Sequence, residues 1–192
     1  VASRQSGIRT TDEFVKALRA NPGKYNYATI GTGNLFHFAG ETLRQRTKTT
    51  LAHVPYKSVS NITTDLGGGV IEFAFLGTGT AKGFIDNGLV TPIGVTRGTR
   101  LPMYPQVPAL AEHPELRGFD FAGWFAVMAP KGLPEPVAER LRVAVKAAIQ
   151  DERFRKAIEG MGGQVATGDG DIARHIREDT ARYQALVDSL KL

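Results

Sequence analysis

Residues 28–45 read ATIGTGNLFHFAGETLRQ, and this stretch decides the fold. A β-prone run, residues 25–30, leads into a loop with two glycines, Gly31 and Gly33, and residues 37–46 then have the composition of a helix. A strand, a glycine loop and a helix start are typical of a nucleotide-phosphate cradle, of a site for another anion, or of a plain tight turn. All three interpretations are open at this point.

Strand and helix signals alternate along the first half of the chain. The further strand candidates are residues 51–55, 70–76 and 90–96, and helices are expected after Thr10, after Ser58 or Ser60, and after Gly77. Strands that alternate with helices at this spacing favour parallel pairing, because parallel neighbours need a crossover element. The sequence therefore predicts an α/β fold.

The pattern changes after residue 96. Residues 97–118 are rich in proline and lack periodicity, which indicates a long connection, and residues 119–128, FDFAGWFAVM, are an apolar strand candidate. We therefore expect one domain over residues 1–118 and a second region over 119–192. Three helices are predicted in that region, with apolar positions at Val137, Leu141, Val145, Ile149, Phe154, Ile158, Ile172, Ile176, Tyr183, Leu186 and Leu190.

Composition narrows the classes of function. The chain has 192 residues, of which 42% are hydrophobic, so it is long enough to build a core. Its net charge of +5 comes from interspersed basic and acidic residues, which indicates a solvated surface rather than a nucleic-acid partner. Cysteine is absent. Because the chain begins at Val1, we expect its native start to have been removed by processing or truncation.

The glycine loop departs from the nucleotide motifs. A dinucleotide fingerprint needs a third glycine where this chain has Phe36, and the P-loop sequence does not occur. Exposed backbone N–H groups at a helix start attract other anions as well. Thr32 and Asn34 add side-chain donors to the loop.

Two further loops repeat this arrangement. The segments HVPYKS, residues 53–58, and LGTGT, residues 76–80, each end a predicted strand with polar groups ahead of a helix. Ligands of open α/β sheets gather at the carboxyl ends of the strands. We therefore predict a site for an anion, most simply a carboxylate, formed by Gly31, Thr32, Gly33, Asn34, His37, Tyr56, Lys57, Ser58, Thr78, Gly79 and Thr80.

Catalytic and metal-binding motifs are missing from the sequence. There is no G-x-S-x-G elbow, no cysteine nucleophile and no H-E-x-x-H, and the spacing of His37 and His53 fits no metal motif. We predict a binding protein without metal or cofactor, in which both histidines are hydrogen-bonded structural residues. The alternative is a small α/β enzyme acting on an anionic metabolite.

Four segments resemble one known family. The sequences GTGNLFHFAGETL, AHVPYKSVSNITTDLGGGVIEFAF, LPMYPQVPALAEHPELRGFDFAGWFAVMAPKGLP and AIEGMGGQVATGD are similar to the substrate receptors of tripartite tricarboxylate transporters, the Bug family. The resemblance implies a periplasmic, type II binding protein of the Venus-flytrap kind, with two α/β lobes. Such a receptor captures a small carboxylate and delivers it to membrane-embedded transporter subunits.

The resemblance also implies that part of the receptor is absent from this chain. Family members begin with a half-lobe that precedes the first residue here, so residues 1–118 correspond to the second lobe. Residues 119–192 correspond to a crossing strand and the C-terminal helices of the first lobe. We expect these helices to lack their usual partners and the 192-residue chain to be a poor receptor. The helices are then expected to pair as a homodimer, to rearrange against the second lobe, or to be unstable.

Overall fold

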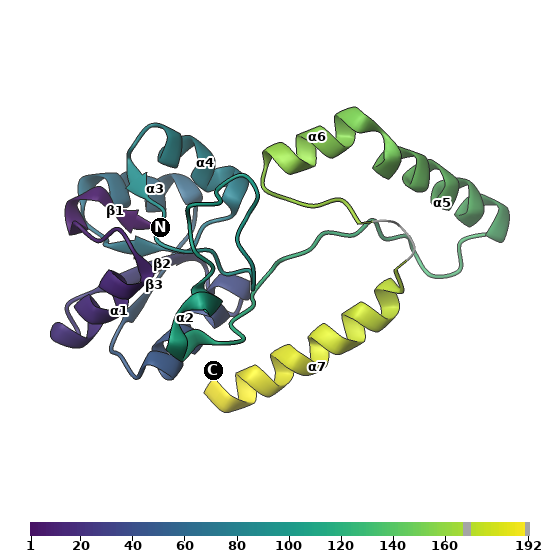
Figure 1. Cartoon of the computed structure of the whole chain (residues 1–192). Helices are drawn as coiled ribbons and strands as arrows, with labels where there is room; N and C mark the ends of the chain where they lie inside the picture. The colour runs from purple at the N-terminus through teal and green to yellow at the C-terminus, as the bar shows by residue number, and fades with distance from the viewer. Residues whose placement is uncertain (167–169, 191–192) are drawn as a thin grey trace. The chain divides into compact units, whose positions relative to one another are not determined.

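A five-stranded mixed sheet organises the first part of the chain (Figure 1). The strands are β1 (Ala2–Ser3), β2 (Asn26–Ile30), β3 (Ala52–Tyr56), β4 (Phe73–Ala74) and β5 (Val90–Thr91), and their order in the sheet is β3-β2-β4-β1-β5. Strand β2 is parallel to β3 and to β4, which confirms the predicted pairing for these three strands. Strand β1 was not predicted, and it is antiparallel to both of its neighbours.

The computed structural model describes residues 1–166 and 170–190. The chain divides into two compact units, the first formed by residues 1–123 with the end of the chain from Leu186, and the second by residues 124–185. Within the first 123 residues the helices are η1 (Arg4–Ser6), α1 (Thr11–Ala20), α2 (Leu35–Thr47), α3 (Val59–Gly68), α4 (Thr78–Asp86), η2 (Leu110–Glu112) and η3 (Pro114–Leu116).

Two strands are shorter than the sequence predicted, each for a local reason. The amides of Val70 and Ile71, which follow α3, both donate to the carbonyl of Asp65 in its last turn, and this leaves β4 to begin at Phe73. Pro92 follows β5 and has no N–H to continue the ladder, so pairing resumes only as a single bridge between Val95 and Ala109.

Helices cover both faces of the sheet, as the alternation of side chains along β2 requires. Tyr27 lies on one face, against α2, where it is fully buried; a Cβ atom on Gly40 would come within 2.2 Å of the Tyr27 ring. Ala28 points to the opposite face and packs with Ile62 and Leu66 of α3. This close packing holds the start of α2 at the end of β2.

The connection over residues 97–118 is confirmed as lacking strands and α-helices, yet it contributes to the core. Its apolar side chains fold back onto the first unit, and the buried ones are Leu101, Tyr104, Val107, Ala109, Leu110 and Leu116. The prolines therefore shape a packed segment rather than a loose linker.

The strand predicted over residues 119–128 is not formed. Phe119 and Phe121 are buried, and the Phe121 amide donates to the Thr96 carbonyl at 2.8 Å. From residue 122 to 130 every side chain is exposed, Phe125 completely. A strand needs neighbours for its backbone N–H and C=O groups, and the described residues place no strand beside this segment.

The remaining helices are α5 (Glu135–Gln150), α6 (Glu152–Gly160) and α7 (Ile172–Leu190). Local capping is present: Asp151 Oδ1 accepts hydrogen bonds from the amides of Arg153 and Phe154 at the start of α6. The described side chains of the three helices include no buried residue, so nothing in the described part of the chain fully covers their predicted apolar positions. No helix among the described residues is both long enough and apolar enough to cross a bilayer.

Candidate functional site

Three loops meet at one edge of the sheet because three neighbouring strands run in the same direction. Strand β2 lies between β3 and β4, and all three are parallel, so their carboxyl ends share an edge. Each strand is followed by the N-terminus of a helix: β2 by α2, β3 by α3, and β4 by α4. The Gly31 amide donates to the Tyr56 carbonyl at 2.9 Å and so ties the first loop to the second.

The two glycines of the first loop adopt a conformation that favours glycine. Gly31 has φ of 65° and Gly33 has φ of 67°, both in the left-handed region. Thr32 between them is exposed, and among the described residues no partner is present for its hydroxyl. Thr32 is therefore the side chain of this loop that is available to a ligand.

Asn34 has a structural role at the start of α2. Its Oδ1 atom accepts hydrogen bonds from the amides of Phe36 at 2.9 Å and His37 at 3.1 Å, and its Nδ2 group donates to the Ile30 carbonyl. This is an N-cap, which satisfies backbone donors that a helix leaves without partners. The donor predicted for a ligand is used within the loop.

Strand β3 leads to a loop in which some polar groups are used in internal hydrogen bonds and one is available to a ligand. The Tyr56 hydroxyl donates to Asp65 Oδ2 at 2.6 Å, and burial, with the hydrogen bond and charge of Asp65, raises the pKa of Tyr56 to about 12. Tyr56 thus stays a neutral donor that braces α3. Ser58 caps α3 by accepting from the Asn61 amide at 3.3 Å, whereas Lys57 is exposed and can attract anions.

Helix α4 presents the least satisfied donors of the edge. Its N-cap is Gly77, which has no side chain to accept a hydrogen bond, and the first intrahelical bond runs from the Ala81 amide to the Gly77 carbonyl at 2.9 Å. The amides of Thr78, Gly79 and Thr80 therefore precede the helical ladder, at the positive end of the helix dipole. These three predicted site residues lie together in one turn.

His37 and His53 lie behind the first loop as a stacked pair. Their ring centroids are 4.2 Å apart and the rings are inclined by 24°. His37, only 8% exposed, accepts a hydrogen bond at Nδ1 from the Gly33 amide at 3.1 Å. His53 Nε2 lies 2.7 Å from the Thr29 hydroxyl, which donates to the Gly31 carbonyl at 2.8 Å. Both histidines are hydrogen-bonded, and neither faces a metal-binding cluster within the described residues.

A buried carboxylate completes this network. The Tyr27 hydroxyl donates to Glu41 Oε1 at 2.9 Å, and Glu41 Oε2 forms an ion pair with Arg44 at 2.7 Å. Burial and the Glu41 carboxylate raise the pKa of Tyr27, which remains a neutral donor. Thr29, Tyr27 and Glu41 were not predicted from the sequence; of the three, only Tyr27 is set opposite a predicted residue, His53, by the register of β2 on β3.

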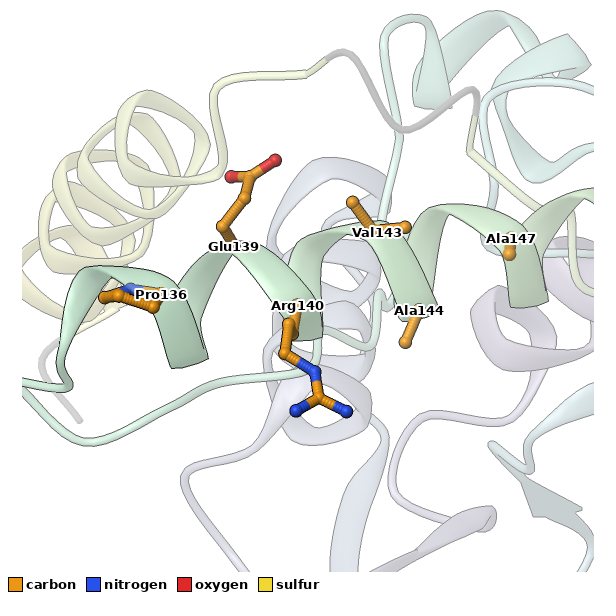
Figure 2. A pocket seen from close by; sticks show the side chains of 6 residues that line it. All are labelled: Pro136, Glu139, Arg140, Val143, Ala144 and Ala147. Carbon is orange, nitrogen blue, oxygen red and sulfur yellow. The ribbon is translucent and has the colours of Figure 1, made fainter.

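The hollow along α5 is a separate feature (Figure 2). All six side chains that line it belong to this one helix: Pro136, Glu139, Arg140, Val143, Ala144 and Ala147. Its charged members do not converge, and Glu139 is paired with Arg142. It lacks the convergent polar groups expected of a ligand site.

Comparison with solved structures identifies the fold. A Rhodopseudomonas palustris protein determined with adipate superposes with a TM-score of 0.88 at 22% identity, covering 99% of this chain and 64% of that one. The periplasmic binding protein BugD gives 0.83 at 23% identity, with 99% and 64% covered. MatC from the same Rhodopseudomonas species, with bound malate, gives 0.78 at 22% identity, with 97% and 64% covered. The predicted α/β fold of the periplasmic-binding-protein type is confirmed.

Sequence comparison identifies the family. A Pseudomonas protein of the UPF0065 group is 33% identical over 193 residues, which cover 100% of this chain and 57% of that protein. BugT of Bordetella pertussis is 27% identical over 183 residues, covering 94% and 55%. The chain thus spans a little over half the length of these relatives, a coverage consistent with truncation. The matched proteins are receptors and give no support to the enzyme alternative. The family model described as "Tripartite tricarboxylate transporter family receptor" matches residues 1–192, so the chain belongs to this family, TctC, as its resemblance to the Bug receptors predicted.

Proposed function

We propose that the receptor of which this chain spans a part captures a small carboxylate at the sheet edge formed by the loops after β2, β3 and β4. The observation that supports this most directly is the meeting of three helix N-termini at the ends of three parallel strands. The amides at the start of α4 and the hydroxyl of Thr32 supply donors, and Lys57 supplies positive charge. Helix N-termini with unsatisfied amides suit a carboxylate group, which accepts hydrogen bonds at two oxygens.

Residues 1–118 form one lobe of this periplasmic receptor, and residues 119–192 belong to the other. The receptor delivers its carboxylate to membrane-embedded transporter subunits. Adipate and malate, bound in two structures of the same fold, indicate dicarboxylates as the first ligands to test. The comparisons give no support to the homodimer that the sequence analysis considered.

Calorimetric titration of the full-length receptor with adipate and malate tests the site. We expect Thr32→Ala to weaken binding of the preferred carboxylate by about 10- to 150-fold, because the loss of a hydrogen bond to a charged group costs about 1.5–3 kcal/mol. Thr50→Ala is the matched control: Thr50 is also exposed but precedes β3, at the opposite edge of the sheet. Unchanged affinity in Thr32→Ala would remove the loop from the site. Absence of binding of either ligand by the unmodified full-length receptor would contradict the choice of dicarboxylates as its ligands.

A further inference from the structure

A buried threonine in β2 holds the backbone of the glycine loop. Thr29 is fully buried, and its hydroxyl donates to the Gly31 carbonyl at 2.8 Å. The oxygen of the same hydroxyl lies 2.7 Å from Nε2 of His53. The hydroxyl has a single proton and the carbonyl can only accept, so Nε2 of His53 is the donor in its contact with Thr29. Thr29 therefore links a buried imidazole ring to the loop.

His53 is suited to donate to Thr29. Burial, with a smaller effect of the neighbouring His37, lowers the pKa of His53 to about 4, so the ring is neutral at pH 7 and carries one proton. When this proton is on Nε2, it occupies the Thr29 oxygen and leaves the hydroxyl proton for the Gly31 carbonyl. The direction of the Thr29 hydroxyl is thus fixed from both sides.

The orientation of the Gly31 carbonyl determines that of the next amide. The peptide between Gly31 and Thr32 is trans and planar, so its C=O and N–H groups point in opposite directions. Because the carbonyl points at the buried Thr29, the N–H of Thr32 is turned away from the buried layer. Thr32 is exposed, and within the described chain its N–H has no hydrogen-bond partner.

A second contact holds the loop from the same side. His37 Nδ1 accepts from the Gly33 amide at 3.1 Å, and its ring stacks on that of His53. The Gly31 amide is taken by the Tyr56 carbonyl. Both glycine amides are therefore used inside the protein, and the intervening amide is the backbone donor that the loop offers at its surface. The carbonyl opposite the Gly33 amide is turned outward in the same way and remains an acceptor for water or a ligand hydroxyl.

We propose that Thr29 is a positioning residue, which turns the Thr32 amide towards the ligand edge and makes it a backbone donor to the bound carboxylate. This inference rests on the proposed function of the sheet edge. The amide and the hydroxyl of Thr32 then act on the same anion. Without the Thr29 hydroxyl, the peptide after Gly31 can rotate, since glycine tolerates a wide range of backbone angles. A rotated peptide presents its carbonyl oxygen to the anion, which it repels.

Calorimetry on variants of the full-length receptor tests the positioning with adipate and malate. We expect Thr29→Val, which keeps the shape of the side chain but lacks the hydroxyl, to weaken binding of the preferred carboxylate by about 3- to 30-fold. The loss is smaller than for removal of a ligand donor, because the freed peptide still visits the productive orientation. Thr29→Ser restores the hydroxyl and should bind within about 2-fold of the wild type.

Thr47→Val is the matched control. Thr47 is also fully buried, and its hydroxyl donates to the Leu43 carbonyl at 2.8 Å and contacts that of Thr49 at 2.9 Å. It is the last residue of α2, about 18 Å along the helix from the glycine loop. Thr47→Val should lower the unfolding midpoint as Thr29→Val does but leave the affinity unchanged. Equal losses of affinity in the two variants, unchanged affinity in Thr29→Val, or no rescue by Thr29→Ser would overturn the inference.

Spectra of the ligand-free receptor separate this inference from the proposed function. The ¹³C resonance of the Gly31 carbonyl should shift in Thr29→Val and keep its position in Thr29→Ser, and an unshifted resonance in Thr29→Val would count against the inference. The wild type supplies a check that needs no variant. Its His53 ring should carry the proton on Nε2, since a proton on Nδ1 would direct the Thr29 hydroxyl to His53 instead of Gly31 and refute the positioning. If both spectra are as expected but neither carboxylate binds, the proposed ligands are wrong while the orientation of the loop peptide stands.

Discussion

The two units of the chain differ in how their apolar residues are used. In residues 1–123, helices α1 to α4 place side chains such as Leu18, Leu43 and Leu66 where no solvent reaches them. In α5 and α6 the apolar residues are as regularly spaced, yet Leu141 remains 48% exposed and Phe154 41%. Periodicity and caps are sufficient to define a helix locally, but burial needs a second surface. The comparison shows that an apolar stripe predicts a helix more securely than it predicts a core.

Substitution of a matched leucine in each unit tests this difference most strongly. We expect Leu66→Ala, which empties a fully buried position in α3, to lower the free energy of unfolding by about 3–5 kcal/mol. Leu141→Ala on α5 should change it by no more than about 0.5 kcal/mol, as for a surface site. Urea unfolding followed by circular dichroism measures both. Equal losses would show that α5 is packed in solution and would break the comparison.

The free energy of unfolding should depend on pH because of His53, which lies in the first unit. Because the pKa of His53 is lowered from 6.5 to about 4 in the folded chain, the unfolded chain binds more protons between these values. The contribution of His53 to the free energy of unfolding is fully present above pH 6.5 and is lost as the pH falls through 4, by roughly 3 kcal/mol in total. Unfolding midpoints measured from pH 7.5 to 4 should show this loss reduced in His53→Gln. His175→Gln on the exposed face of α7 should retain the wild-type profile, and a reversed ranking would contradict the assignment.

Substitution of one glycine in each unit should give the smallest difference in stability. A Cβ atom at Gly40 would lie 2.2 Å from the Tyr27 ring, so Gly40→Ala should cost about 1–3 kcal/mol through overpacking. Gly160, the last residue of α6, has no atom within 4 Å of such a Cβ and no left-handed backbone. Gly160→Ala should therefore be neutral or add up to about 1 kcal/mol. Thermal unfolding of both variants provides the measurement, and a neutral Gly40→Ala would mean that α2 moves away from the sheet at little cost.

The elements of the first unit were predictable because their signals are local. Thr10 was predicted to cap α1, and its Oγ1 accepts from the Glu13 amide at 3.1 Å. Strand β1 was missed because two residues contain no periodicity, and it is defined only by partners more than 70 positions away. The strand prediction from residue 119 was wrong for the opposite reason. The composition of this segment is that of a strand, but the described chain contains no neighbouring strand for it to pair with.

The meeting of the three loops was predictable from the sequence, but the availability of individual donors was not. Parallel strands and their order bring Thr32, Ser58 and Thr78 to one edge, as the sequence pattern indicated. Sequence alone could not show that the Asn34 amide group closes its own loop or that the Tyr56 hydroxyl is taken by Asp65. These hydrogen bonds depend on where the other side chains lie after packing, and residue spacing in the sequence does not specify those positions.

The antiparallel insertion of β1 also sets the order in which the sheet can be completed. Ala2 pairs with Phe73 and with Thr91, so β1 has no partner until most of the first unit is in place. Until then the edges of β1 and of both its partners are unpaired, and an unpaired edge is the kind of surface to which another chain can add a strand. Completion of this sheet thus depends on its pairings of longest sequence separation, which are expected to form late.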